Sequence, residues 1–394
     1  MPMRSWVLSV LTLSTLVACG ACRSTKQGPA DCVLVPDGFG PDGAVPVRAE
    51  VVASGLEVPW AIGFLPNGDA LITERPGRIR LLEDGQLVTA PVAQLAVRNQ
   101  GEGGLLGLAV HPEFATNRLF FVYFTSEQRG IAENRVERWQ LTEDHRSAAF
   151  DRVILEGMPA ANVHDGGRLR IGPDGLLYLS LGDAREPSRS QDPSASNGKI
   201  LRLTLDGEIP ADNPFPGSAA WIIGVRNSQG FDWRDDDTMW VVDHGPTGDL
   251  GRTGHDEVNV AGRGSNLGWP ELIGCETREG RVTPSLTWEG AVPPGGAAIY
   301  TGTEIGPWRG SLLVGTLGSR HLHRVAFADD GRTVSTHEVY FRGNPPEGLG
   351  RLREVVMGPD GHLWITTSNC DGRGDCPADG DKVLRVRSAS APSP

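Results

Sequence analysis

The chain has 394 residues, a formal net charge of -12, 52 glycines and 29 prolines. The acidic balance excludes a partner whose affinity comes from neutralising phosphates, so nucleic acid is set aside. The glycine and proline content, and the lack of long helical periodicity after the N-terminus, favour many short strands and turns over a helical protein.

The N-terminus has the pattern of an export signal. Arg4 precedes an apolar run over 6–18, which is too short to span a bilayer as a mature helix. The run ends in LVAC at 16–19, which resembles a bacterial lipobox. That resemblance implies a lipoprotein signal peptide over 1–18 and a lipid on Cys19, the only link to a membrane that the sequence indicates; the protein would then face an extracytoplasmic space. An ordinary cleaved signal peptide is the alternative.

Two segments without periodicity flank the rest of the chain. Residues 19–48 are rich in Gly, Pro, Ala and Asp and predict a flexible tether. Residues 388–394 consist mainly of Ser, Ala and Pro and predict a disordered tail.

One pattern recurs along the chain: an alternating apolar strand, a turn and a second alternating strand. In chain order the copies lie at 62–73, 111–124, 169–180, 231–243, 308–317 and 355–366. An Asn-Gly or Asp-Gly turn marks the first, third and last copies, and the other three are weaker. Hairpins roughly 50 to 75 residues apart suit propeller blades. We therefore predict an all-β chain, a six-bladed β-propeller of four-stranded antiparallel blades over 49–387, with the polar loops at one rim.

The cysteines agree with export. If Cys19 carries a lipid, five cysteines remain, and that odd number leaves at least one unpaired. Cys370 and Cys376 bracket a tight loop, DGRGD, so a local disulfide is expected between them. Cys275 could pair with Cys32 or with Cys22, and the sequence does not decide which.

A polar pair stands at the two ends of the hairpin at 169–180. His164 lies just before its first strand and Asp183 just after its second. Antiparallel pairing brings these ends together, so the imidazole and the carboxylate are expected to meet. A carboxylate that holds a neutral histidine is the arrangement of a general base, although both side chains could instead satisfy turns.

Seven sequence blocks, in order, resemble the signature of the glucose/sorbosone dehydrogenase family of soluble, quinone-dependent aldose dehydrogenases. They are GEGGLLGLAVHPEF (101–114), HDGGRL (164–169), GVRNSQG (224–230), DHGP (243–246), DEVN (256–259), GSNLGWP (264–270) and RLREV (351–355). The likeness covers nearly everything from Glu50 to Arg387. It implies an oxidoreductase that oxidises aldose sugars at the anomeric carbon to lactones, by hydride transfer to pyrroloquinoline quinone (PQQ), with an external electron acceptor.

The resemblance also implies catalytic roles. His164 matches the base that takes the sugar's hydroxyl proton, and Asp183 matches the carboxylate that orients it. Arg226 and Asn227 match residues facing the quinone carbonyls, where a cation and an amide stabilise the charge that develops on reduction. A salt bridge between blades is the structural alternative for Arg226.

Arg351 and Arg353 alternate on one predicted strand, so their side chains point the same way. Two guanidinium forks on one face suit the carboxylates of the implied cofactor. Without the resemblance, the pair would be taken as a solvated strand edge.

Calcium is the second cofactor that the resemblance implies. Gly245 and Pro246 match a pair whose backbone carbonyls hold a calcium ion that also binds the quinone. Asp256 and Glu257, with the carbonyl of Leu267, resemble a second, structural calcium site. A cluster of surface charges is the alternative for the acidic pair.

The sequence departs from the family's pattern at three places. Glu102 replaces a common cofactor-side Gln, which removes a donor and adds charge beside the base, and we expect an upward shift of the pH optimum. Gly318 stands where the family supplies a cofactor-binding Lys, and Arg320 is the nearest substitute. The loop over 247–255 is longer than usual.

Two other functions stay open. Gly318 and Glu102 would suit a non-catalytic propeller that binds a ligand or protein and has lost quinone binding. A calcium-dependent, lactonase-type hydrolase is the third reading, but it requires several inward carboxylates around one metal. A nicotinamide enzyme is excluded by the lack of a G-x-G-x-x-G motif between a strand and a helix. Trp233, Trp240 and Trp269 are expected in blade cores.

Overall fold

The structure is a computed structural model that describes Met1, residues 32–128 and residues 130–390. The predicted lipidation site Cys19, Cys22 and residues 2–18 of the predicted signal peptide lie outside this part of the chain. Within it, no helix is both long and apolar enough to cross a membrane.

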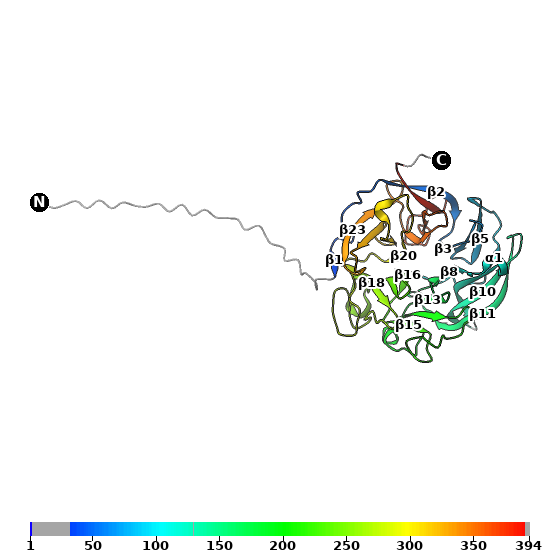
Figure 1. Ribbon diagram of the computed structural model, residues 1–394, viewed down its shortest axis with the longest axis horizontal. Coiled ribbons are helices and arrows are strands. Elements are labelled where there is room, and N and C mark those ends of the chain that lie inside the picture. The colour runs from blue at the N-terminus through cyan, green and yellow to red at the C-terminus, as the bar shows by residue number, and fades with distance from the viewer. Residues whose placement is uncertain (2–31, 129, 391–394) are drawn as a thin grey trace.

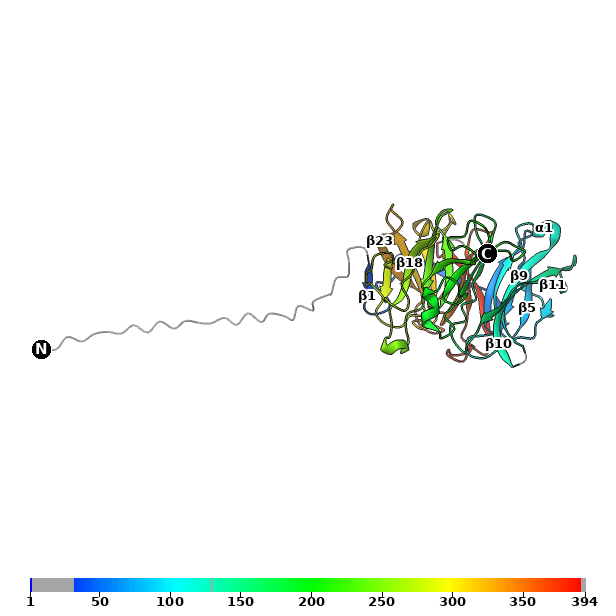
Figure 2. The same ribbon diagram turned by 90° about the horizontal axis from the view of Figure 1, so that it is seen from below.

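Six mainly antiparallel sheets surround a central axis as the blades of a propeller (Figure 1), and the ring is seen edge-on in Figure 2. Blade 1 comprises β3 (Pro59–Phe64), β4 (Ala70–Glu74), β5 (Arg78–Glu83), β6 (Gln86–Leu87) and β7 (Ala93–Gln94). Blade 2 comprises β8 (Leu105–Val110), β9 (Leu119–Gln128), β10 (Ile131–Leu141) and β11 (Ala148–Pro159). Blade 3 comprises β12 (Leu169–Ile171), β13 (Leu177–Leu181), β14 (Lys199–Leu203) and β15 (Ala220–Ile223).

Blades 4 to 6 follow in the same inner-to-outer order. Blade 4 comprises β16 (Ser228–Trp233), β17 (Thr238–Asp243), β18 (Asp256–Gly262), β19 (Leu286–Trp288) and β1 (Val33–Val35). Blade 5 comprises β20 (Pro294–Ile299), β21 (Leu312–Thr316), β22 (Leu322–Phe327) and β23 (Val334–Tyr340). Blade 6 comprises β24 (Leu352–Met357), β25 (Leu363–Thr367), β26 (Asp381–Ser388) and β2 (Val47–Leu56). The described helices are one turn each: α1 (Phe114–Asn117), η1 (Pro187–Gln191), η2 (Asp249–Gly251) and η3 (Gly306–Trp308).

Four blades have four strands, as predicted, and two sheets carry a fifth. In blade 1 the extra strand is β7, which pairs with β5. In blade 4 it is β1, which pairs parallel to β19. Blade 6 closes the ring, because β2 from the N-terminal side pairs antiparallel with β26 from the C-terminal side.

The segment 32–48, which the sequence analysis assigned to the tether, lies on the propeller. Cys32 forms a disulfide with Cys275, and Val35 is buried in the core between blades 4 and 5. The backbone N–H of Gly43 donates to the carbonyl of Val339 at 2.8 Å. An apolar side chain and a cross-link therefore hold a stretch whose composition is typical of a linker.

The predicted hairpins at 62–73, 169–180, 231–243 and 355–366 coincide with the two innermost strands of blades 1, 3, 4 and 6. The hairpin at 111–124 starts too late, because the inner strand β8 ends at Val110 and the turn α1 follows it. The hairpin at 308–317 contains only one strand of its pair.

The missing strand of that pair is β20, whose sequence PGGAAI has little apolar alternation. A Cβ on Gly295 would lie 2.7 Å from the carbonyl oxygen of Arg353 in blade 6. Glycine is needed there because two inner strands approach each other closely. The same packing removes the side chains by which a strand is recognised.

Apolar side chains fill the spaces between neighbouring blades. Five buried clusters form this core, the largest of which joins blades 1 to 3. Strand and turn order thus place the loops before each inner strand and after the second strand at one end of the propeller.

Candidate active site

A cavity of about 420 Å³ lies among these loops. Its lining residues are Arg75, Glu102, Val163, His164, Arg185, Arg226, Gln229, His244, Gly245, Thr247, Asp249, Asp256, Pro293, Leu317, Arg351, Arg353, Asp371 and Arg373. Six of them are arginines and four are acidic. The excess of positive charge suits an anionic ligand.

His164 and Asp183 meet at the base of the blade 3 hairpin. The Nδ1–H of His164 donates to Asp183 Oδ1 at 2.7 Å, and the indole of Trp269 donates to Asp183 Oδ2 at 2.9 Å. Asp183 is fully buried, so both carboxylate oxygens are held in fixed directions. A carboxylate bound in this way fixes the orientation and the tautomer of the imidazole.

The backbone at His164 is in the left-handed region, with φ 68°. Its N–H donates to Glu102 Oε2 at 2.9 Å, which holds this conformation. A Cβ on Gly182 would lie 2.1 Å from the carbonyl oxygen of His164, so only glycine allows the two loops to approach. Uncommon backbone geometry of this kind persists where the surrounding structure determines it.

The other imidazole nitrogen faces the cavity and accepts a hydrogen bond from Arg226. The distance between Arg226 Nη2 and His164 Nε2 is 2.8 Å. Because Nδ1 donates to Asp183 and Nε2 accepts from a guanidinium, the hydrogen bonds assign an unprotonated Nε2. This nitrogen has one lone pair, so it can take a proton from a ligand hydroxyl once Arg226 has moved off it.

Arg226 also forms an ion pair with Asp249, and its guanidinium lies 5.5 Å from the ring centre of Trp269. The backbone N–H groups of Arg226 and Asn227 donate to the two oxygens of Asp243, each at 2.8 Å. Burial raises the pKa of Asp243 to about 6. The carboxylate fixes the start of β16, and with it the direction of both side chains.

The side-chain amide of Asn227 forms hydrogen bonds with the loops next to His164. Its oxygen accepts from Gly166 N–H at 3.0 Å, and its Nδ2 lies 3.3 Å from His244 Nδ1 and 3.4 Å from Glu102 Oε2. Burial lowers the pKa of His244 to about 3, so this ring is neutral and donates from Nε2 to the carbonyl of Pro294. Asn227 is fully buried and does not line the cavity, so the structure places it behind His164, where its amide joins the surrounding loops.

Glu102 keeps its charge despite its position. Burial by itself would raise its pKa, but His244, the N–H of His164 and the guanidinium of Arg373 outweigh that effect and lower it. The carboxylate accepts from Arg373 at 3.0 Å. Glu102 is thus a hydrogen-bond acceptor that joins two loops at the cavity wall.

Arg351 and Arg353 point into the cavity from the start of β24. Arg351 donates to Asp371 from Nε and Nη2, at 2.9 and 2.7 Å, and Arg353 donates to Gln229 Oε1 at 2.6 Å. Burial lowers the pKa of Arg353 to about 9. The buried Nε atoms of Arg353 and Arg226 have no hydrogen-bond partner, so the described residues leave donor capacity for an anion at this wall.

The structure does not bring Arg320 to the cavity. Its guanidinium donates to Asn344 at 2.8 Å and lies 3.5 Å from Asp375. A Cβ on Gly318 would lie 2.9 Å from Pro293, one of the lining residues. Gly318 therefore packs at the cavity wall and supplies no cation there.

Four of the five predicted metal residues surround a second, very small cavity of about 10 Å³. Its lining includes Gly245, Pro246, Glu257, Leu267 and Asp243. Burial, and next the charge of Asp243, raises the pKa of Glu257 to about 8. Carboxyls that are costly to ionise fit a site that a cation would complete.

Asp256 is not part of that small cavity. Successive side chains of a strand point to opposite faces, so Asp256 lines the large cavity while its neighbour Glu257 lines the small one. Asp256 accepts from the N–H groups of Gly245 and Val292, at 3.0 and 2.6 Å. Among the described residues, no three His, Cys, Asp or Glu side chains converge as a metal site, so any ion there depends on backbone carbonyls.

Several site residues were missed by sequence reasoning. Asp249 lies in the long loop, Asp371 inside the disulfide loop, and neither loop conformation follows from its sequence. Trp240 is in a blade core and Trp233 packs against one, as expected, whereas Trp269 is buried against Asp183 as a hydrogen-bond donor. Its position inside a glycine-rich block was the available signal.

Known proteins are similar to this chain in sequence and in fold. Residues 56–376 match the family model described as glucose/sorbosone dehydrogenase. The aldose sugar dehydrogenase YliI of Escherichia coli is 32% identical over 83% of this chain and 91% of its own, and quinoprotein glucose dehydrogenase B of Acinetobacter calcoaceticus is 29% identical over 88% and 91%. The PQQ-bound aldose sugar dehydrogenase of Streptomyces coelicolor has a TM-score of 0.75 at 33% identity and covers 87% of this chain and 99% of its own. The chain therefore belongs to the glucose/sorbosone dehydrogenase family.

Proposed function

We propose that the protein oxidises aldose sugars at the anomeric carbon to lactones, with PQQ as the hydride acceptor. The observation that carries the proposal is the buried His164–Asp183 pair, whose unprotonated Nε2 opens into a cavity with six arginines. A hydrolase that uses metal-bound water would need carboxylates converging on a metal, and the described residues offer no such group.

His164 acts as the base. Its Nε2 accepts the proton of the sugar's anomeric hydroxyl, and Asp183 stabilises the imidazolium that results. Arg226, which donates to the same nitrogen in this structure, would give up that lone pair to the sugar's hydroxyl and supply a positive charge beside the site of proton removal. Trp269 holds Asp183, and Gly182 allows its loop to pack against the backbone of His164, so the imidazole keeps its place during the transfer.

PQQ, when bound, supplies a two-electron acceptor that the twenty amino acids lack. Arg351 and Arg353 would hold its carboxylates, and Arg226 would face its carbonyls, whereas Asn227 lies behind the cavity wall and would support Gly166 and Glu102. The unpartnered Nε atoms of Arg353 and Arg226 support this assignment. Arg320 lies outside the cavity and cannot replace the lysine that Gly318 lacks, so the cofactor has one cation fewer than the family's pattern provides.

Calcium belongs to the same proposal. Residues predicted for two calcium sites, Gly245 and Pro246 for one and Glu257 and Leu267 for the other, surround the same small cavity and would hold one ion there with backbone carbonyls and one carboxylate. Two disulfides are typical of a protein that works outside the cytoplasm. A lipid on Cys19 would place it at a membrane surface, and Cys19→Ser should then release it into the soluble fraction.

The test is reconstitution of the purified protein with calcium and PQQ, followed by dye-linked reduction with a panel of aldoses. We expect saturable turnover that needs both additions, and none from the His164→Ala variant, which should still bind the cofactor. Turnover in that variant at the wild-type rate would refute the mechanism, and the absence of cofactor binding to the wild type would refute the function.

A further inference from the structure

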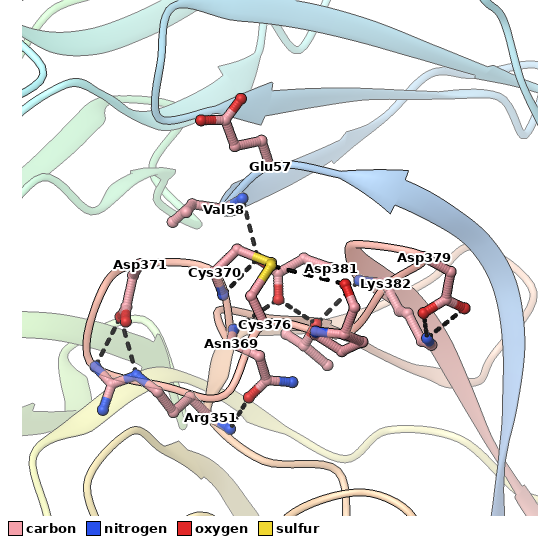
Figure 3. Close-up of a disulfide and its surroundings, with 12 residues drawn as sticks. Glu57, Val58, Arg351, Asn369, Cys370, Asp371, Cys376, Asp379, Asp381 and Lys382 are labelled. Atoms are coloured by element: carbon pink, nitrogen blue, oxygen red, sulfur yellow. Dashed lines mark hydrogen bonds and ion pairs between the residues drawn. A yellow bond between two sulfur atoms is a disulfide. The ribbon is translucent and has the colours of Figure 1, made fainter.

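The loop that follows β25 reaches the cavity from inside a disulfide ring. Cys370 and Cys376, six positions apart, are bonded to each other, and Asp371 lies in the loop between them (Figure 3). The same loop carries Arg373. Both of these side chains line the cavity. A single short loop thus contributes one carboxylate and one guanidinium to the site.

Asp371 holds Arg351, which directly precedes β24, and lies close to Arg353 within it. Its Oδ2 accepts from Arg351 Nε and Nη2 and lies 3.5 Å from Arg353 Nη2. Arg351 Nη1 donates to the carbonyl of Leu317 at 2.8 Å. A guanidinium has five N–H groups, so three are taken and two, one on each Nη, stay available for a ligand. Asp371 decides which way those two point.

Arg373 joins the same loop to the base. It donates to Glu102 Oε1, while Glu102 Oε2 accepts the backbone N–H of His164. The side chain of Arg373 is 54% exposed, so the path of the loop and the ion pair with Glu102 keep it at the cavity. The loop therefore contacts both the arginine wall and the wall that carries His164.

The two ends of the loop differ in how they are held. At the start, the carboxylate of Asp381 accepts the N–H groups of Asn369 and Cys370, at 2.6 and 3.2 Å. Beyond Asp371 come Gly372 and Gly374, and the chain is mostly exposed up to Cys376. Glycines give this half of the loop the largest backbone freedom, and three restraints hold it: the disulfide, the ion pair of Arg373 with Glu102 and the hydrogen bond from Asn344 to Asp375.

We propose that the Cys370–Cys376 disulfide and Asp371 form a positioning device that sets the affinity for the anionic cofactor. It rests on the proposed function, because the ligand it serves is PQQ. Asp371 is a positioning residue, since it acts through Arg351 and Arg353. Opening the disulfide lets the glycine-rich half of the loop move, and the guanidinium groups lose their common orientation.

The device is open to reduction from solvent. Cys376 is exposed, whereas Cys32 of the other disulfide is buried. A dithiol reductant that attacks the exposed sulfur gives two cysteine thiols in the protein and a cyclic disulfide of the reagent, a balanced two-electron exchange. An exposed disulfide is the one that such a reagent reaches first.

The first experiment compares Cys370→Ser/Cys376→Ser with Cys32→Ser/Cys275→Ser in the full chain. The charge of the cavity is the same in both. We expect the Kd for PQQ to rise on the order of tenfold in the first variant, as for one lost charge-assisted hydrogen bond, and to stay unchanged in the second. Mild dithiothreitol treatment of the wild type should reproduce the first result. Equal Kd values in the two variants would overturn the proposal.

The Asp371→Asn variant separates orientation from charge. Loss of a negative charge alone would tighten the binding of an anion, so a lower Kd would contradict a positioning role. We expect a higher Kd, with kcat at saturating PQQ close to that of the wild type. Asp379→Asn is the matched control, because Asp379 pairs with Lys382 on the surface in the same region (Figure 3).

Hydrogen–deuterium exchange without any ligand tests the device independently of the proposed function. The backbone N–H of Arg351 donates to Asn369 at 2.8 Å, next to the loop. We expect faster exchange at residues 351–354 as well as at 370–376 when the disulfide is removed. Faster exchange confined to 370–376 would refute the proposal even if the protein binds PQQ. If exchange becomes faster in both segments but the wild type does not bind PQQ, the positioning role stands and only the assignment of PQQ as the ligand is refuted.

Discussion

The two walls of the cavity are held in different ways. At the His164 wall, the proposed base His164 and its partner Asp183 lie 19 positions apart at the ends of one hairpin and are fixed by buried backbone and indole donors. At the Arg351 wall, two guanidinium groups depend on a carboxylate in an exposed, glycine-rich loop closed by a disulfide. One wall is set by strand pairing, and the other by a cross-link.

This difference between the two walls indicates that one serves proton transfer and the other serves binding of the cofactor. Proton transfer needs a base held within a fraction of an ångström, and a buried hairpin end supplies that rigidity. Binding a large anion requires cations with free donors, and Arg351 and Arg353 keep such donors although both are buried. Substitutions at the His164 wall should therefore act on turnover, and those at the Arg351 wall on cofactor affinity.

The largest effect is expected from His164→Asn. Removal of the base should lower kcat by about a hundred- to ten-thousand-fold, while the Kd for PQQ stays close to that of the wild type. Dye-linked turnover and a cofactor titration measure the two quantities. His145→Asn, in a surface turn of blade 2, is the control. A change in Kd as large as the change in kcat would remove the distinction between the two walls.

Arg353→Lys tests the opposite wall. It keeps the charge but replaces the planar fork that matches a carboxylate, so the Kd for PQQ should rise about tenfold with little change in kcat at saturation. Arg385→Lys, which alters a surface ion pair with Glu50, is the matched control. If kcat falls and Kd does not, Arg353 serves the chemical step and not the binding of the cofactor.

The rigidity of the His164 wall can be tested through Lys199. Its ammonium donates to the carbonyls of Arg189, Ser190 and Asn197, and Asn197 in turn donates to the carbonyl of Asp183. Burial lowers the pKa of Lys199 to about 7. Between about pH 7 and 10.5 the unfolded chain then binds a proton that the folded chain has lost, so folding stability should increase with pH.

The increase should be at most about 1.4 kcal/mol per pH unit. Denaturant unfolding of the wild type and of Lys199→Met over this window measures it, since the variant lacks the titrating group. A stability difference that does not vary with pH would mean that the three carbonyls keep the ammonium charged.

The smallest effect is expected from Glu102→Gln. The amide retains an acceptor for the N–H of His164 and removes one negative charge from the cavity, so the Kd for PQQ should fall a few-fold, in line with an exposed ion pair to Arg373. The control is Glu127→Gln, in an exposed pair with Arg98. Weaker binding would show that the carboxylate orients Arg373 toward the cofactor.

The sequence by itself determined the six-bladed ring and the pairing of His164 with Asp183. Asn-Gly and Asp-Gly turns between alternating strands define hairpins locally, and the two ends of a hairpin must meet. The inner strand β20 was not predicted, because its glycines pack against the neighbouring blade and leave no alternating pattern of side chains.

Only the tertiary structure decided which residues share the cavity. Arg320 is close in sequence to the expected lysine position, but its guanidinium is taken by Asn344 and Asp375. Asp256 and Glu257 are neighbours in the chain, yet strand alternation sends them to different cavities. Asp249, Asp371 and Trp269 reach the site on loops, and loop paths are set by contacts between blades that sequence spacing does not encode.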